Sequence, residues 1–307
     1  MRTSKRRRLL SFGVGLLLLL ASNEGHAGAF LDLRAEHPSK LHILAIGINK
    51  YSGEIGPLRY ARTDAEAVVE ALKQSFKGTV QWQELLDEQA TREAIEVAME
   101  KIIADAKPQD LFVLYFGGSS QVGPDKEFYL LSVNVIERQG DFLSQAISSN
   151  LLKAWLSRIQ ANKQLVILDS CDGKQPMASV VSRIEEEDIR GARLSDRRVM
   201  IVGTDGLAME VEKLKHGVLT LHLLHCLTSA ADVLPKDGVI TARELDVSIR
   251  GQTTLWQKSG IEQAVVSVAV GRDFVVAHVH DYRGVADDEI PLQDRKSESA
   301  DGGPGRD

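Results

Sequence analysis

A cysteine at the end of an apolar run is the residue in this chain best suited to nucleophilic chemistry. The run Leu165-Val-Ile-Leu-Asp-Ser-Cys171 is short and apolar, which predicts a buried strand that delivers the Cys171 thiol to its carboxyl end. Open α/β sheets bind their ligands at that edge. Because the cysteine thiolate is a strong nucleophile, we predict Cys171 at the nucleophile position of a catalytic site.

A second predicted strand end carries no histidine that could activate this thiol. The apolar run Leu111–Phe116 leads into a Gly-Gly-Ser-Ser sequence, in which Ser119 lies 52 residues before Cys171. An imidazole beside a cysteine lowers the thiol pKa from about 8.5 and protonates the leaving amine. Ser119 does neither at neutral pH, and the Asp172 carboxylate would disfavour a thiolate near it. Loss of a general acid–base group costs about 10²- to 10⁴-fold in rate, so efficient turnover is not expected.

Other residues offer alternatives to the missing imidazole. His216 precedes a predicted helix and is the best of these, whereas His42 begins the first strand, at the opposite end of the sheet. Ser119 or Ser120 as a serine nucleophile would lack an identified base. The remaining histidines of the predicted folded part lie in an apolar helix or on a late strand, where a structural role is expected: His222, His225, His278 and His280.

Apolar runs that alternate with helical periods predict a mostly parallel sheet with helices on both faces. The predicted strands cover 41–49, 80–86, 111–116, 128–133, 164–170, 198–204, 263–270 and 274–280. The predicted helices cover 63–75, 91–106, 150–160, 218–231 and 241–250. A capping box of Thr63 and Glu66 is expected to open the first helix. The charged segment 174–193 is predicted to be a surface loop.

The first 29 residues have the composition of a secretory signal peptide. A basic stretch precedes the apolar core Leu9–Ala21, whose 13 residues are too few to span a bilayer of roughly 30 Å as a helix. Ala27-Gly28-Ala29 supplies small residues for a cleavage site. An uncleaved N-terminal anchor is the alternative. We expect export to the periplasm or extracellular space, with no stable membrane anchor after cleavage.

The rest of the chain is predicted to form a lead-in over 30–39, one domain over 40–280 and a disordered polar tail over 281–307. The leader carries five basic and one acidic side chain, which leaves 32 Lys and Arg against 42 Asp and Glu, a net charge of about −10. An acidic surface repels phosphate backbones, so no nucleic-acid partner is expected. The oligomeric state is not predicted.

Neither a disulfide framework nor a metal site is expected. Only two cysteines are present, so a single bridge between Cys171 and Cys226 remains open, although Cys226 lies in an apolar helical run. Asp237-Gly238 followed by Glu244 partly fits a calcium-binding loop, but its first and third positions would carry no side-chain oxygen. That segment is predicted to be a turn before a helix.

Several segments, taken in order, resemble those of the caspase-like peptidases, which include metacaspases and bacterial C14-type cysteine endopeptidases. They lie between Lys40 and Val276: Leu44–Tyr51, Leu58–Leu72, Ala146–Leu156, His216–Thr220, Asp237–Leu245 and Gly271–Val275. This resemblance implies a caspase-like fold, with a mostly parallel six-stranded sheet sandwiched between helices. The family usually has Tyr-Phe-Ser-Gly-His-Gly where this chain has Tyr115-Phe-Gly-Gly-Ser-Ser120, so Ser119 stands at the position of the dyad histidine.

The resemblance also implies a substrate pocket. In metacaspase-like relatives an acidic pocket accepts an Arg or Lys side chain, and its two aspartates match Asp64 and Asp169. Structural roles remain open for both aspartates. The Asp64 carboxylate would lie in the first turn of a helix, where it interacts favourably with the helix dipole, and Asp169 could accept hydrogen bonds from loop amides. The alternative is a pocket that selects aspartate side chains, because Arg59 and Arg62 lie nearby in the sequence. The Gln-Ala-Cys pattern of caspases is missing, however. No cofactor is predicted; calcium activation is implied by resemblance alone.

These observations predict an exported, degenerate cysteine endopeptidase homologue that binds peptide or protein through its cleft. The alternative is an active cysteine endopeptidase that uses Cys171 and cleaves after Arg or Lys.

Overall fold

The computed structural model describes residues 37–51, 55–135, 142–171, 197–204, 210–211, 215–233, 235–258 and 264–279, all within one compact unit that spans Ala35–Asp307. For Cys171 the backbone is described but the side chain is not. The predicted leader, the loop over 174–193, His280 and the tail over 281–307 lie outside the described residues. No described helix has the length and apolar character needed to cross a membrane.

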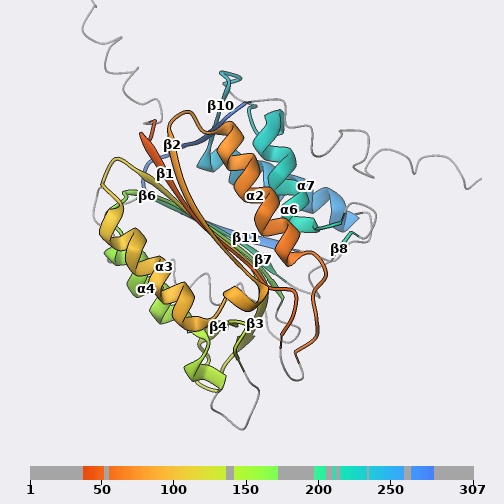
Figure 1. The fold of residues 1–307 in the computed structure, drawn as a ribbon. Coiled ribbons are helices and arrows are strands. Elements are labelled where there is room, and N and C mark those ends of the chain that lie inside the picture. Colours follow the sequence, from red (N-terminus) through yellow and green to blue (C-terminus); the bar gives the residue numbers. More distant parts are fainter. Residues whose placement is uncertain are drawn as a thin grey trace, which may run out of the picture. The chain divides into compact units, whose positions relative to one another are not determined.

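A mainly parallel sheet forms the centre of this unit (Figure 1). Its strands are β1 Lys40–Gly47, β2 Thr79–Leu86, β3 Leu111–Val122, β4 Phe128–Leu130, β5 Ile147–Ser148, β6 Lys163–Cys171, β7 Arg197–Thr204 and β11 Ala264–Val270. Six of them follow the order β11-β7-β6-β3-β1-β2, and β4 and β5 extend from β3. Along the six-strand path only the β11–β7 pair is antiparallel. The two small pairs are β8 Glu210–Val211 with β9 His216–Gly217, and β10 Val239–Thr241 with β12 Val275–His278.

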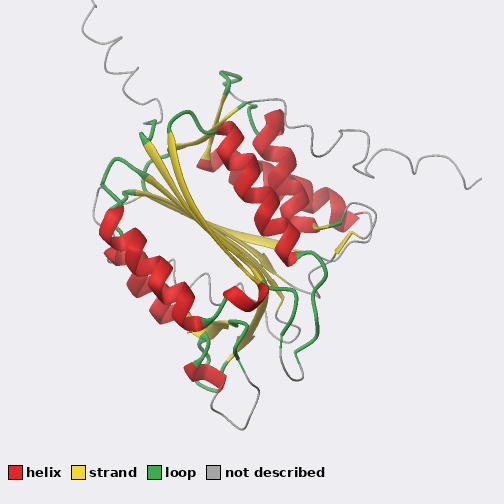
Figure 2. Ribbon diagram, in the orientation of Figure 1, coloured by secondary structure: helices red, strands yellow, loops and turns green. Residues whose placement is uncertain are grey.

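Helices cover both faces of the sheet (Figure 2), which confirms the predicted class. One face carries α2 Ala61–Ser75, α6 Val218–His225 and α7 Ala242–Lys258, and the other carries α3 Arg92–Asp105 and α4 Ser149–Arg158. Successive residues of β1 contribute to opposite cores, with Ile43 on the α2 side and Leu44 on the α3 side. Burial on both faces explains why the central strands are continuously apolar.

The predicted capping box of Thr63 and Glu66 is wrong. Helix α2 begins two residues before Thr63, and the Thr63 hydroxyl donates to the Tyr60 carbonyl at 3.0 Å instead of accepting from an amide. The cap comes from the loop after β1, where Asn49 Oδ1 accepts from the Arg62 N–H at 3.1 Å. Tertiary contact with Asn49 therefore replaces the local motif that the sequence suggested.

Helix α3 has a local N-cap, which gives a first testable prediction. The Thr91 hydroxyl oxygen accepts from the Ala94 N–H at 3.1 Å. Replacing Thr91 by alanine should lower the free energy of unfolding by about 1 kcal/mol, because one amide of the first turn loses its acceptor. Thr63→Ala is the matched control and should cost less than about 0.5 kcal/mol. Urea unfolding measures both, and equal losses would contradict this assignment of the two caps.

Two elements extend differently from their predicted ranges. Strand β3 continues past Phe116 to Val122, because Ser120–Val122 pair antiparallel with β4. The Gly-Gly-Ser-Ser sequence that follows the predicted strand is therefore extended strand as well. Helix α6 ends at His225 and is followed by a π-helical turn, η3 Cys226–Ala230, where one longer helix was predicted.

Candidate active site

The ends of β3 and β6 lie side by side at the carboxyl edge of the sheet. The two strands are parallel neighbours, and their register pairs Gly117 with Asp169 and Ser119 with Cys171. Residues paired across neighbouring strands place their side chains on the same face of a sheet. Ser119 therefore occupies the position directly across from the cysteine.

The backbone of Ser119 is held in place by Tyr51. The Ser119 N–H donates to the Tyr51 hydroxyl at 2.8 Å, and that hydroxyl donates to the Leu131 carbonyl at 3.2 Å. A β-carbon at Gly118 would lie only 2.5 Å from the Tyr51 oxygen, so the tyrosine can approach only because residue 118 is glycine. The segment that carries Ser119 is therefore a fixed strand rather than an adaptable loop.

Two buried carboxylates meet beside Gly217, between helix α2 and strand β6. Asp64 is 3% exposed and Asp169 is 6% exposed. A β-carbon on Gly217 would lie 3.1 Å from Asp64 Oδ2 and 3.2 Å from Asp169 Oδ2. The structure thus brings together the two aspartates that the sequence singles out, and Gly217 provides the space between them.

Hydrogen bonds to both carboxylates come from the segment around α6. Asp64 accepts from His216 Nδ1 at 2.6 Å and from the Gly217 N–H at 3.0 Å. Asp169 accepts from the Thr220 hydroxyl at 3.0 Å. Because that hydroxyl donates its hydrogen to Asp169, the Tyr115 hydroxyl 2.7 Å away must donate to it. Such charge-assisted bonds stabilise carboxylates away from water.

Tyr115 shows how negative this region is. Burial raises the pKa of the Tyr115 phenol well above its usual value of 10, and the nearby Asp169 and Asp64 raise it further. The phenol is therefore a permanent hydrogen donor at physiological pH and no proton acceptor. Sequence reasoning did not identify Tyr115 or Thr220 as site residues, although Thr220 lies within one of the segments that resemble the family.

Gly217 gives a second testable prediction. Its replacement by alanine should lower the free energy of unfolding by roughly 1–3 kcal/mol, because both neighbouring carboxylates are held by hydrogen bonds and cannot retreat from the added methyl. Gly251, in helix α7, would have nothing within 4 Å of an added β-carbon and is the matched control. Gly251→Ala should stabilise by about 0.5–1 kcal/mol. Denaturant unfolding measures both, and no loss at Gly217 would contradict the packing described.

Three further candidates from the sequence lie away from this strand edge or inside the core: His42, His222 and Cys226. His42 lies near the start of β1 and bonds Asp110 at 3.1 Å. His222 is buried in α6, and burial lowers its pKa to about 4. Cys226 is a free thiol, and its burial raises its pKa to about 12, so it is chemically inert.

Two further parts of the chain that the sequence offered as alternatives have local partners, namely Arg62 and the Asp237-Gly238 segment. Arg62 lies near carboxylates of its own neighbourhood, 3.3 Å from Glu66 and 3.5 Å from Asp87. The Asp237-Gly238 segment is a turn, in which Asp232 accepts from both backbone amides at 3.0 Å. Among the described residues no group of three or more His, Cys, Asp or Glu side chains has the geometry of a metal site.

Fold and site together define an α/β protein with a cysteine at the carboxyl edge of a parallel sheet and an acidic cluster beside it. The family model of the C14-peptidase caspase domain matches residues 40–289, so the chain belongs to this family. The resemblance inferred from sequence and the caspase-like fold are thereby confirmed.

A crystal structure of a Geobacter sulfurreducens protein has a similar fold, with a TM-score of 0.51 and 18% sequence identity. The alignment covers 76% of this chain and 94% of the other. At this identity the likeness concerns the fold alone. No curated protein matches the chain in sequence.

Proposed function

We propose that this C14-family protein is exported, has an incomplete catalytic dyad, and binds a peptide or protein segment at the carboxyl edge of its sheet. The observation that carries the proposal is the register of β3 and β6, which puts Ser119 across from Cys171. A hydroxyl in that position neither lowers the thiol pKa nor protonates a leaving amine. Binding then remains as the role of the site.

The acidic cluster supports a preference for basic side chains. Asp64 and Asp169 are buried carboxylates on either side of Gly217, and Tyr115 and Thr220 bring hydroxyl groups rather than cations. An Arg or Lys side chain would add the positive charge that carboxylates in a water-poor site favour. Asp169 lies on β6 two residues before Cys171, so it is the residue whose change should affect such a ligand more directly.

Peptide binding tests this proposal. A fluorescein-labelled peptide with one arginine is titrated with the full chain, beside the same peptide with citrulline in place of arginine. We expect the arginine peptide to bind at least tenfold more tightly, and Asp169→Asn to remove most of that difference, because one of the two carboxylates loses its charge. Glu88→Gln, an exposed change, is the matched control. Equal binding of the two peptides would contradict the proposal.

A second function has one specific observation in its favour. Asp64 orients His216 through Nδ1 at 2.6 Å, the arrangement in which a carboxylate positions a catalytic imidazole and leaves Nε2 to accept a proton. An active endopeptidase would use this pair with Cys171. Cleavage of Arg or Lys substrates that is lost in both His216→Gln and Cys171→Ala would favour this function over the first.

A further inference from the structure

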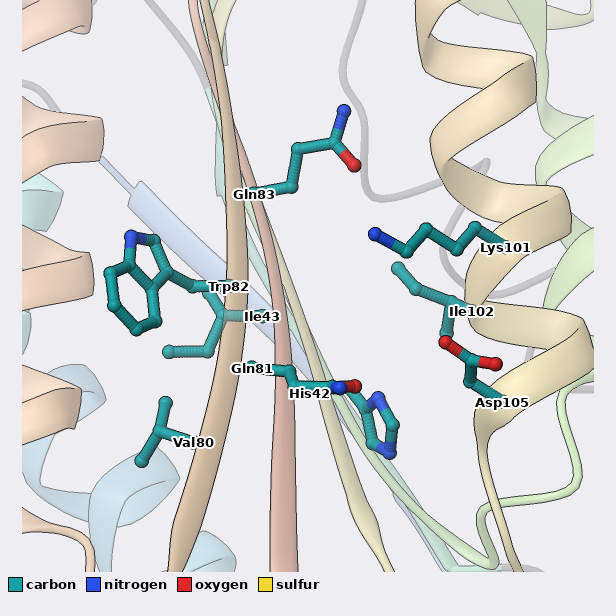
Figure 3. A pocket seen from close by; sticks show the side chains of 9 residues that line it. All are labelled: His42, Ile43, Val80, Gln81, Trp82, Gln83, Lys101, Ile102 and Asp105. Atoms are coloured by element: carbon teal, nitrogen blue, oxygen red, sulfur yellow. The ribbon is translucent and has the colours of Figure 1, made fainter.

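A cavity of about 240 Å³ lies between the edge strand β2 and helix α3 (Figure 3). It is slightly smaller than the roughly 300–1,000 Å³ pockets that hold drug-sized ligands. His42 near the start of β1 contributes to it, far along the strand from the carboxyl edge. The lining residues are His42, Ile43, Val80, Gln81, Trp82, Gln83, Lys101, Ile102 and Asp105.

Polar side chains gather on the α3 side of this cavity. Figure 3 shows His42, Gln81 and Gln83 on that side of the strands, whereas Trp82 and Val80 point to the opposite side. The chain thus presents a polar wall from β1 and β2 opposite α3. In ligand pockets a small number of such polar groups beside apolar side chains fixes the orientation of the ligand.

His42 is a buried group with one ring nitrogen unused. It is 2% exposed, and Nε2 contacts Asp110 Oδ2 at 3.1 Å. The same carboxylate accepts from the Lys107 N–H at 3.0 Å, which fixes its position. Because the carboxylate only accepts, Nε2 carries the hydrogen, and in the neutral tautomer Nδ1 is then an acceptor. Within the described part of the chain Nδ1 has no hydrogen-bond partner, and it is not one of the fully buried atoms, so it is accessible from the cavity that His42 lines.

Opposite charges lie at the two ends of the cavity. Lys101 and Asp105 stand four residues apart on α3, yet they form no ion pair with each other or with any residue that the structure describes. Figure 3 shows Lys101 extending toward Gln83 and Asp105 nearer to His42. The cavity therefore offers a cation with an amide at one end and a carboxylate with an imidazole acceptor at the other.

We propose that this cavity binds a free α-amino acid as its zwitterion. The ligand carboxylate is held by Lys101 and Gln83, and the ligand ammonium group donates to Asp105 and to His42 Nδ1. Each charged group of the ligand then meets its complement, and the imidazole gains the partner that it lacks. This site is separate from the strand edge that carries Cys171, and its occupation does not depend on the function proposed there.

Calorimetry on the full chain with the free L-amino acids tests the proposal. At least one should bind with a Kd in the micromolar to low millimolar range, and its N-acetyl and carboxamide derivatives should each bind at least tenfold more weakly. Lys101→Met and Asp105→Asn should each weaken binding at least tenfold. Lys236→Met, an exposed change in the turn before β10, should leave the Kd unchanged.

Two results would overturn this inference. One is the lack of any amino acid that binds with a Kd below about 10 mM. The other is a bound amino acid whose affinity is the same in the Lys101→Met and Asp105→Asn variants as in the wild type. Lys101 and Asp105 are exposed, so these variants should fold, and the derivatives test the charge requirement without any change in the protein.

Discussion

Replacing Ser119 by histidine should produce Cys171-dependent cleavage of Arg or Lys peptides, about 10²- to 10⁴-fold faster than the wild type. The register of β3 and β6 pairs residue 119 with Cys171, so the imidazole would be carried by the residue directly across from the cysteine. Fluorogenic peptides with arginine or lysine before the reporter group measure the rate. The gain should disappear when Ser119→His is combined with Cys171→Ala.

Ser120→His is the matched control for this variant. Ser120 is the next residue of β3, so its side chain points to the opposite face of the sheet and should bring no gain in rate. Circular dichroism and thermal unfolding establish that each variant is folded. A folded but inactive Ser119→His variant would contradict the view that the protein lacks protease activity because the imidazole is missing.

Acid should destabilise this protein through His222. Its pKa is about 4 in the folded state, because burial penalises the charged ring and His225 adds a smaller repulsion, against 6.5 for an exposed histidine. Below pH 6.5 the unfolded chain therefore binds a proton that the folded chain refuses, and stability falls until about pH 4. The difference between the two pKa values corresponds to roughly 3 kcal/mol. At pH 7 this contribution is nearly zero.

Denaturant unfolding between pH 7 and pH 4 measures this effect. His222→Gln should lose less stability over that interval than the wild type, by roughly 3 kcal/mol, whatever its stability at pH 7. His225→Gln is the matched control and should retain most of the wild-type pH dependence. Parallel curves for His222→Gln and the wild type would show that His222 is not the titrating group.

The fold could be predicted because its local patterns agree with its architecture. Strand β1 is apolar at every position from Ile43 to Ile46, since Leu44 and Ile43 pack into different cores on the two faces of the sheet. Helix α3 has both a helical period and a local cap at Thr91. Each of these signals lies within a few residues of the element that it predicts, which is why the element order agrees with the structure.

Features that depend on distant partners could not be predicted in this way. The N-terminus of α2 is capped by Asn49, whose side-chain oxygen accepts a hydrogen bond from the Arg62 N–H, 13 residues further along the chain. The chain of hydrogen bonds from Tyr115 through Thr220 to Asp169 joins residues 105 and 51 positions apart. Neither contact has a local sequence pattern. The sequence singled out Asp64 and Asp169, but the space that Gly217 leaves between them emerges only from the fold.

The most direct test of the incomplete dyad compares the wild type with Cys171→Ala on fluorogenic peptides that end in arginine or lysine, with and without calcium. We expect the same background rate from both proteins, because Ser119 cannot activate the thiol. Wild-type cleavage with kcat/KM of about 10⁴ M⁻¹ s⁻¹ or more that disappears in Cys171→Ala would contradict this account and show that the chain is a working protease.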